Sequence, residues 1–252
     1  EALAYHPEEL YLYPLYVRPL TTLGRKARAA ASALPLAPAP APTSAPGDAE
    51  LDRRRLALYE QGRDLLRAAG YRQVSMRMFR RVAAGATGTA AGTGAAGTGT
   101  AAGPVYCCQD DGMIGLGCGA RSYTRAVHYS SEWAVGARGV REIIDRWIAR
   151  PDAAFAVADH GFVLDGGEQR RRWLILSLLS EDGASLAAYR RRFARDVADD
   201  FPELAELAAR GLAARAGDTL RLTPEGLARA DSIGPWLGSA AVRRRMAEYE
   251  LA

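Results

Sequence analysis

The sequence predicts an α/β fold for residues 1–125, followed by a mainly helical carboxy-terminal domain over residues 126–252. Leu10–Val17 is aromatic and apolar, as buried strands are, and residues 52–69 repeat leucines at helical spacing. Tyr71–Phe79 then alternates like a second strand. A strand, a helix and a strand in this order indicate a parallel crossover.

A short apolar strand that runs into a glycine turn follows at Asp111–Tyr123 and predicts a second βα repeat. Gly115, Gly117 and Gly119 alternate along this turn. Because glycine lacks a Cβ atom, its backbone can approach a ligand closely or adopt a positive φ. The spacing is not the dinucleotide-binding fingerprint, which needs glycine where Ser122 stands. The turn by itself fits both a tight structural βα junction and a cofactor contact.

The carboxy-terminal half reads as a series of amphipathic helices. Helices are predicted at Val140–Arg150, at Gln169–Ser180, at Ser185–Arg195 and between Pro202 and Gly211. Two short apolar stretches flanking Ala216-Gly217-Asp218 predict a hairpin, after which Thr223 caps a last helix. This order indicates a small winged-helix-like module.

Two low-complexity stretches interrupt the amino-terminal part. Residues 28–48 alternate alanine and proline, which predicts an extended linker because proline has no amide donor and restricts the residue before it. Residues 83–103 are Gly-, Ala- and Thr-rich with almost nothing to bury, and they predict a surface loop. This tract lacks the Gly-Lys-Ser/Thr ending of a phosphate loop.

Composition indicates a soluble, cytoplasmic protein. The 252 residues include 3 Cys, too few for a disulfide framework, and the longest apolar run is far shorter than a membrane span. The 33 Lys+Arg barely exceed the 29 Asp+Glu, and Lys26 is the only lysine, which is typical of GC-rich coding. Arginine runs such as Arg170–Arg172, Arg190–Arg192 and Arg243–Arg245 are therefore expected on solvent faces, and nucleic acid is not the expected partner.

Four segments resemble, in the same order, the radical SAM family that includes the oxygen-independent coproporphyrinogen III oxidases and their haem-chaperone relatives. The most specific is the core IGLGCGARS, which is similar to the family signature D-x-I-G-x-G-x-G-A-H-S. The four segments are Glu9–Arg25, Leu56–Arg81, Asp111–Ser122 and the stretch from Arg221 to Ile233. Together they span nearly the whole chain apart from the two low-complexity stretches.

The resemblance implies the later strands of a radical SAM barrel, followed by the family's helical carboxy-terminal domain. In that family a [4Fe-4S] cluster binds S-adenosylmethionine (SAM) and cleaves it reductively to a 5′-deoxyadenosyl radical. By position, Tyr16, Gly117, Gly119 and Arg121 are the expected SAM-binding residues. The implied substrate is a small molecule of the tetrapyrrole class.

The chain also departs from the family pattern. The cluster motif C-x-x-x-C-x-x-C is absent, because Cys107, Cys108 and Cys118 have neither its spacing nor its position. The signature histidine is replaced by Arg121. We therefore expect no metal ligands in this chain, a fragment that is inactive alone, and the amino-terminal half of the enzyme as a candidate partner in trans.

Two other functions remain open from the sequence. A haem-binding or carrier role, as in the chaperone relatives, would survive loss of the cluster. A winged-helix DNA-binding module is the second, although Ser185–Arg195 supplies mainly Arg and Ala where base-reading residues are needed.

Overall fold

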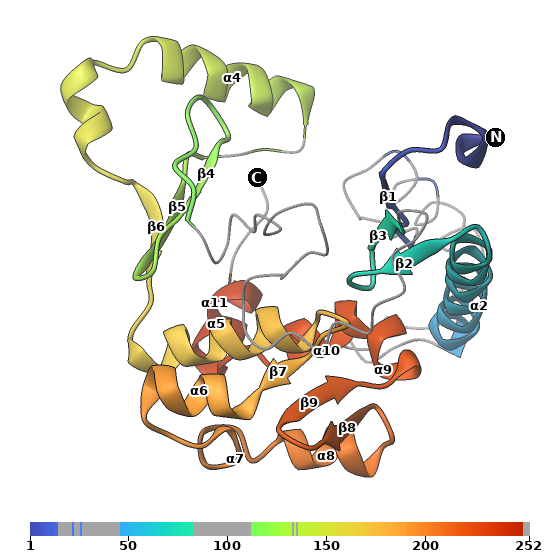
Figure 1. Ribbon diagram of the computed structural model, residues 1–252. Helices are drawn as coiled ribbons and strands as arrows, with labels where there is room; N and C mark the ends of the chain where they lie inside the picture. Colours follow the sequence, from blue (N-terminus) through green and yellow to red (C-terminus); the bar gives the residue numbers. More distant parts are fainter. Residues whose placement is uncertain are drawn as a thin grey trace.

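The computed structural model describes residues 1–14, 22, 26, 46–82, 112–132, 134 and 136–248. Tyr16, Cys107, Cys108, the glycine-rich tract and most of the Ala-Pro stretch lie outside the described residues. Within the described part, Figure 1 shows a helical layer built around helix α5 (Gly166–Leu178), with two small sheets above its opposite ends. No described helix is long and apolar enough to cross a bilayer.

The amino-terminal sheet contains β1 (Glu9–Tyr11), β3 (Met78–Arg81) and β2 (Tyr71–Gln73) in that spatial order. A 3-10 turn, η1 (Ala2–Tyr5), precedes it, and helix α2 (Pro46–Ala68) links β1 to β2 along the chain. β1 and β2 run in the same direction, but each pairs antiparallel with β3, which lies between them. The predicted crossover therefore does not form adjacent parallel strands.

The single strand predicted at Tyr71–Phe79 is a hairpin. The Val74 amide donates to the Met78 carbonyl at 2.8 Å, and the Met78 amide donates to the Ser75 hydroxyl at 3.3 Å. These bonds reverse the chain between β2 and β3 and create the antiparallel pairing. Helix α2 also begins at Pro46, so the linker predicted to reach residue 48 ends before it.

Tyr59 fixes helix α2 against this hairpin. Its side chain is buried, its hydroxyl donates to the Met76 carbonyl and it accepts from Gln73 Nε2 at 2.9 Å. Burial raises the pKa of the Tyr59 hydroxyl to about 12, so the phenol stays protonated and keeps donating at all physiological pH values. Met76, Ala228 and Ala230 pack around the ring and join this unit to the carboxy-terminal helices.

The second sheet contains β4 (Arg121–Tyr123), β5 (Val127–Ser130) and β6 (His160–Val163), all antiparallel. Met113 extends β4 on its other side through an antiparallel bridge to Tyr123. The second βα repeat predicted here is therefore wrong: the glycine turn reverses the chain into a neighbouring strand rather than into a helix. Helix α4 (Ala137–Ile148) and η2 (Asp152–Ala156) lie between β5 and β6.

The carboxy-terminal helices and the hairpin are confirmed. The order is α5, β7 (Ala184–Ser185), α6 (Leu186–Phe193), α7 (Val197–Asp200), α8 (Leu204–Ala209), β8 (Ala213–Ala216) and β9 (Thr219–Leu222). The strands pair antiparallel in the spatial order β7-β9-β8. The Thr223 hydroxyl accepts from the Gly226 amide at 3.1 Å and caps α9 (Pro224–Ala228), as predicted. Helices α10 (Ala230–Trp236) and α11 (Ala240–Glu248) follow.

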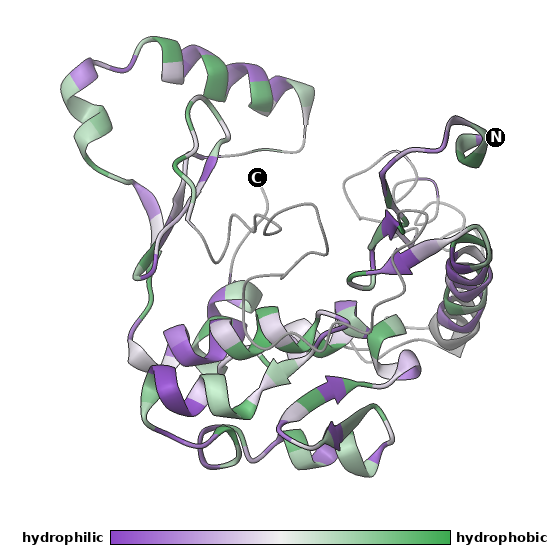
Figure 2. Ribbon diagram, in the orientation of Figure 1, coloured by the Kyte–Doolittle hydropathy of each residue, from purple (hydrophilic) through white to green (hydrophobic). Residues whose placement is uncertain are grey.

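The α/β class is thus correct, but no complete radical SAM barrel is present among the described residues. Every strand pair described there is antiparallel. The largest apolar core instead lies in the carboxy-terminal domain, where Trp173, Leu174, Leu178 and Tyr189 are buried together. Figure 2 shows α5 hydrophilic near its start and hydrophobic farther along, where it enters this core.

The arginines of α5 are not on a solvent face. Arg170 and Arg171 are only 28% and 20% exposed, and each pairs with a carboxylate of the same domain, Asp200 and Glu203. Arg171 also donates to the Leu237 carbonyl at 2.6 Å. Because the three arginines are consecutive, a helix turn of 3.6 residues directs them to different sides of α5.

Asp200, the last residue of α7, contacts three polar side chains. Its carboxylate is 6% exposed, accepts the Tyr189 hydroxyl at 2.5 Å and pairs with Arg195 at 2.5 Å and Arg170 at 3.1 Å. Burial opposes ionisation of this carboxyl, but the bonds from Tyr189 and Arg195 outweigh it, so the pKa of Asp200 lies below its usual range. Burial and the bond to Asp200 raise the pKa of Tyr189.

We predict that Asp200→Asn lowers the free energy of unfolding by about 2 to 3 kcal/mol at neutral pH, because it removes a charge paired with two arginines. A carboxyl with a lowered folded pKa stabilises the protein above its unfolded pKa of about 4, and loses that contribution as the pH falls through the folded value. Urea unfolding from pH 7 to pH 2.5 should therefore show the wild type and the variant converging at low pH. Asp199→Asn, on the exposed side of α7, is the matched control.

Candidate functional site

The glycine turn predicted to hold a cofactor closes a hairpin between Met113 and β4. The Met113 amide donates to the Tyr123 carbonyl at 2.9 Å, and the Tyr123 amide donates back at 2.8 Å. At Gly115 the chain passes very close to the backbone of β4. A Cβ atom at this position would lie 2.5 Å from the Arg121 carbonyl oxygen. Its amide donates to the buried Ser122 hydroxyl at 3.0 Å. Gly115 is therefore required by the hairpin itself.

Gly117 and Gly119 have a different role in the turn. Their φ angles are +100° and +76°, and a Cβ atom at either would meet nothing within 4 Å. The turn thus leaves open space on the Cβ side of these two positions. Part of its backbone is already hydrogen-bonded, because the Gly119 amide donates to the Ser131 hydroxyl and the Gly117 carbonyl accepts from the Ala120 amide at 3.2 Å. Arg121 is exposed on β4, so the three described residues of the predicted SAM site lie on one exposed hairpin. Tyr16 is the fourth predicted residue, and the structure does not describe it.

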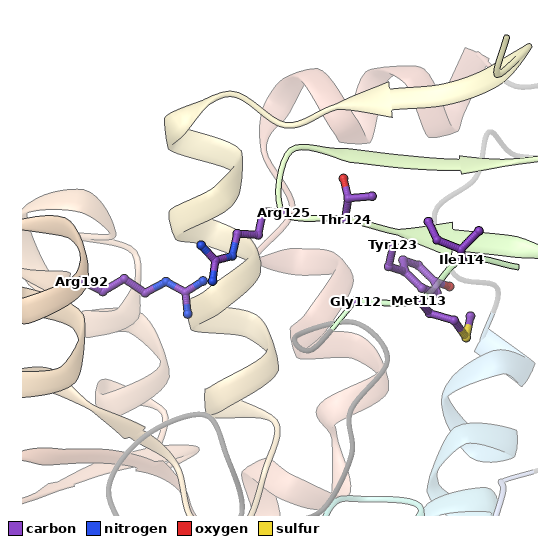
Figure 3. A pocket seen from close by; sticks show the side chains of 7 residues that line it. All are labelled: Gly112, Met113, Ile114, Tyr123, Thr124, Arg125 and Arg192. Atoms are coloured by element: carbon purple, nitrogen blue, oxygen red, sulfur yellow. The ribbon is translucent and has the colours of Figure 1, made fainter. Parts of the chain in front are cut away.

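A cleft of about 580 Å³ opens beside the hairpin. It is lined by Gly112, Met113, Ile114, Tyr123, Thr124, Arg125 and Arg192. Figure 3 shows that these side chains come from the two strands of the hairpin, from the turn after β4 and, in the case of Arg192, from helix α6. Arg125 and Arg192 were not predicted as site residues. Arg192 is part of an arginine run that the sequence pattern assigns to solvent.

Three arginines lie on the cleft side of the sheet. Arg125 and Arg192 line the cleft, and Arg172 of α5 donates from Nη1 to the Thr124 carbonyl at 2.7 Å. Burial, and then the charge of Arg172, hold the pKa of His128 below its usual value. The imidazole therefore stays neutral at pH 7, packed edge-on against Tyr123 at 5.0 Å between ring centres. Its Nε2 atom is buried and makes no hydrogen bond within the described part of the chain.

The residues present do not fit an iron-sulfur cluster. Cys118 is exposed, and no group of three His, Cys, Asp or Glu side chains gathers within the described ranges. The spacing of Cys107, Cys108 and Cys118 along the chain is also not that of a cluster loop.

Comparison with known families identifies the helical part of the chain. Residues 164–229 match the family described as the HemN C-terminal domain. This part of the chain is therefore similar to the HemN C-terminal domain. The match begins at the buried Leu164, immediately before α5, and ends where α9 does. It confirms, for this domain, the resemblance that the motifs predict.

One solved structure extends this likeness beyond the HemN C-terminal domain. Its title is "Coproporphyrinogen III oxidase (HemN) from Escherichia coli is a Radical SAM enzyme", and it matches with a TM-score of 0.59 at 18% sequence identity. The match covers 94% of this chain but 49% of the solved chain, so the present chain spans about half the length of that protein. At this identity the match establishes a similar fold. No curated protein matches the chain.

We predict that Gly115→Ala lowers the free energy of unfolding by about 1 to 3 kcal/mol, because the added methyl group overlaps the Arg121 carbonyl and must push the hairpin apart. Gly136→Ala is the matched control. Gly136 is the N-cap of α4, with a φ of −82° and open space at its Cβ position, so its replacement causes no overlap and should cost less than that of Gly115. Equal effects of the two variants on denaturant unfolding would show that the hairpin does not depend on this close approach.

Proposed function

We propose that this chain is the carboxy-terminal portion of a radical SAM oxidoreductase that resembles the oxygen-independent coproporphyrinogen III oxidases and acts on a small molecule of the tetrapyrrole class. The observation that carries the proposal is the HemN C-terminal domain at residues 164–229, within a chain whose fold is similar to that of the E. coli enzyme over 94% of its length.

In this proposal the hairpin contributes to SAM binding. Gly117 and Gly119 would present backbone to the cofactor, Arg121 would supply a positive charge at the edge of the same hairpin, and Tyr16 would complete the site. The [4Fe-4S] cluster would supply the electron for the reductive cleavage of SAM. The cluster would have to be held by residues other than those described here, so we propose that this chain binds and positions the cofactor and is inactive alone.

DNA binding is less well supported by the structure. In a winged-helix module the helix before the hairpin is the natural candidate for the major groove. Here that helix is α8, Leu204–Ala209, whose one charged residue is Glu206, and the adjacent Arg210 pairs with Glu206 at 2.7 Å. An alanine-rich face whose one acid is already paired with an arginine offers phosphate little attraction and presents few base-reading groups.

We predict that Gly117→Ala and Gly119→Ala each weaken SAM binding by the full-length gene product roughly ten-fold, which corresponds to about 1.4 kcal/mol, because a methyl group fills the space where the backbone meets the cofactor. Gly217→Ala is the matched control. Gly217 has a φ of +59° and equally open surroundings, but lies in the β8–β9 hairpin. Alanine at each of the three positions must adopt a positive φ, and Gly119 at +76° is the nearer match to Gly217, so equal losses of SAM affinity in these two variants would contradict the hairpin site.

The enzyme class is tested separately by anaerobic reconstitution of the same full-length product with iron and sulfide. We expect about four irons per chain and SAM cleavage on reduction. Residues 1–252 alone should bind no cluster. A full-length product that takes up neither iron nor sulfide would overturn the radical SAM assignment. A haem absorbance band on titration of that product would then favour the haem-carrier function.

A further inference from the structure

We propose that helix α4 is the contact surface of a homodimer, in which α4 of one chain packs antiparallel against α4 of a second copy. The contact would be made by an exposed apolar row on this helix, defined as Val140, Ile144 and Ile148. Two charged side chains along one edge of the row, Arg141 and Asp145, would form ion pairs across the contact. This surface is separate from the predicted SAM-binding hairpin and does not depend on the SAM assignment.

Helix α4 leaves the apolar row open to solvent. The three side chains of the row are between 39% and 75% exposed, although they lie four residues apart on one side of the helix. The adjoining side of α4 is used by the chain itself, because Ile143 is buried and Trp147 packs edge-on against Phe155, with 4.8 Å between ring centres. Single exposed apolar residues are ordinary on a protein surface, whereas a contiguous apolar patch marks an interaction site.

The position of α4 in the fold leaves this row accessible to a partner. Figure 1 shows α4 at the outer end of the β4–β6 sheet, away from the carboxy-terminal helices. Figure 2 shows hydrophobic and hydrophilic residues alternating along the same helix. Residues four apart also form the ridges by which helices most often pack against one another. The row is therefore suited to contact with another helix.

The two charges beside the apolar row differ from the other charges of α4. The other charged side chains of this helix form ion pairs within the chain: Arg138 with Glu142 at 2.9 Å, and Arg146 with Glu132 at 2.8 Å. Arg141 and Asp145 are exposed and have no ion-pair partner among the described residues. They immediately follow the first two residues of the row, so both lie along the same edge of it. This edge therefore offers one cation and one anion to a partner.

The pattern is complementary to itself when two copies of α4 run antiparallel. A two-fold axis perpendicular to both helices then relates them, and the same surface of each copy forms the contact. Ile144 is the middle of the apolar row, and the midpoint between Arg141 and Asp145 is one residue earlier, or about 1.5 Å away along the helix. With the axis at this level, Val140 faces Ile148 of the second copy, and Arg141 comes opposite Asp145 of the second copy. Both the row and the charges are therefore matched by one axis.

The size of the contact sets its strength. Helix α4 has 12 residues, which is about 18 Å of helix, and one face of it is smaller than the roughly 800 Å² per partner of a stable interface. Phe155, which is 44% exposed beside Trp147, enlarges the apolar surface next to the row. We therefore expect a reversible dimer with a dissociation constant of about 10 to 100 μM, because interfaces of this size are weak and transient.

The first test is sedimentation velocity of residues 1–252 from about 1 to about 500 μM, a range that brackets the expected dissociation constant. Ile144→Glu should weaken association at least ten-fold, because it places two carboxylates together at the two-fold axis. Leu58→Glu is the matched control. Leu58 is an apolar residue of helix α2 that is 59% exposed, so its replacement introduces the same charge on a different helix and should leave association unchanged.

The second test reverses the flanking charges. Arg141→Glu and Asp145→Arg each place like charges opposite one another in a homodimer, so each variant alone should associate about five- to ten-fold more weakly than the wild type. A mixture of these two variants should form a heterodimer, because both ion pairs across the contact then regain opposite signs. Arg138→Glu and Glu142→Arg are the matched control pair, with the same spacing on the far side of α4. Alone or mixed, they should associate like the wild type.

Three outcomes would overturn the dimer. A wild-type chain that stays monomeric over the whole concentration range, with circular dichroism showing that it is folded, would leave the apolar row to a different partner. Equal association of the wild type and Ile144→Glu would show that any dimer contact lies elsewhere. A mixture of Arg141→Glu and Asp145→Arg that associates no better than either variant alone would exclude the antiparallel arrangement. None of these measurements uses SAM or iron, so this proposal and the proposed function fail separately.

Discussion

The hydrogen bond from Arg172 to the Thr124 carbonyl places the β4–β6 sheet on the carboxy-terminal domain, and the cleft depends on that placement. A second hydrogen bond supports this placement: the amide of Leu164, just before α5, donates to the Ala126 carbonyl at 2.7 Å. Both bonds use backbone carbonyls of one turn, residues 124–126. A backbone carbonyl that is partly withdrawn from water needs a donor, and Arg172 of α5 provides one for the half-buried Thr124.

The other end of α5 holds the amino-terminal sheet in the same way. The Glu181 amide donates to the Val74 carbonyl at 2.9 Å, and Arg72 bonds the carboxylates of Glu181 and Asp182 at 3.0 and 2.6 Å. Exposed ion pairs of this kind add little stability, but the backbone bond fixes the register between hairpin and helix end. One helix therefore positions two sheets, with its apolar middle anchored in the domain core.

Local signals allowed the carboxy-terminal part to be predicted well. The β8–β9 hairpin pairs residues at most nine positions apart, and the Thr223 cap reaches an amide three positions along, so turn and capping chemistry are enough. The amino-terminal prediction was wrong where pairing is not local. Tyr71–Phe79 alternates like one strand, but its reversal at Val74 and Ser75 also pairs with Ser180 and Glu181, more than a hundred residues away. Alternation alone cannot distinguish parallel from antiparallel neighbours.

The candidate site was also difficult to predict from the sequence pattern alone. The glycine alternation is a single pattern in the sequence, yet the structure gives it two causes: a close backbone crossing at Gly115 and positive φ angles in open space at Gly117 and Gly119. Only the second leaves room for a ligand. The cleft arginines come from segments nearly seventy residues apart, so no spacing rule could join Arg125 to Arg192. The domain that carries the family match therefore also completes the wall of a cleft whose other side is the hairpin.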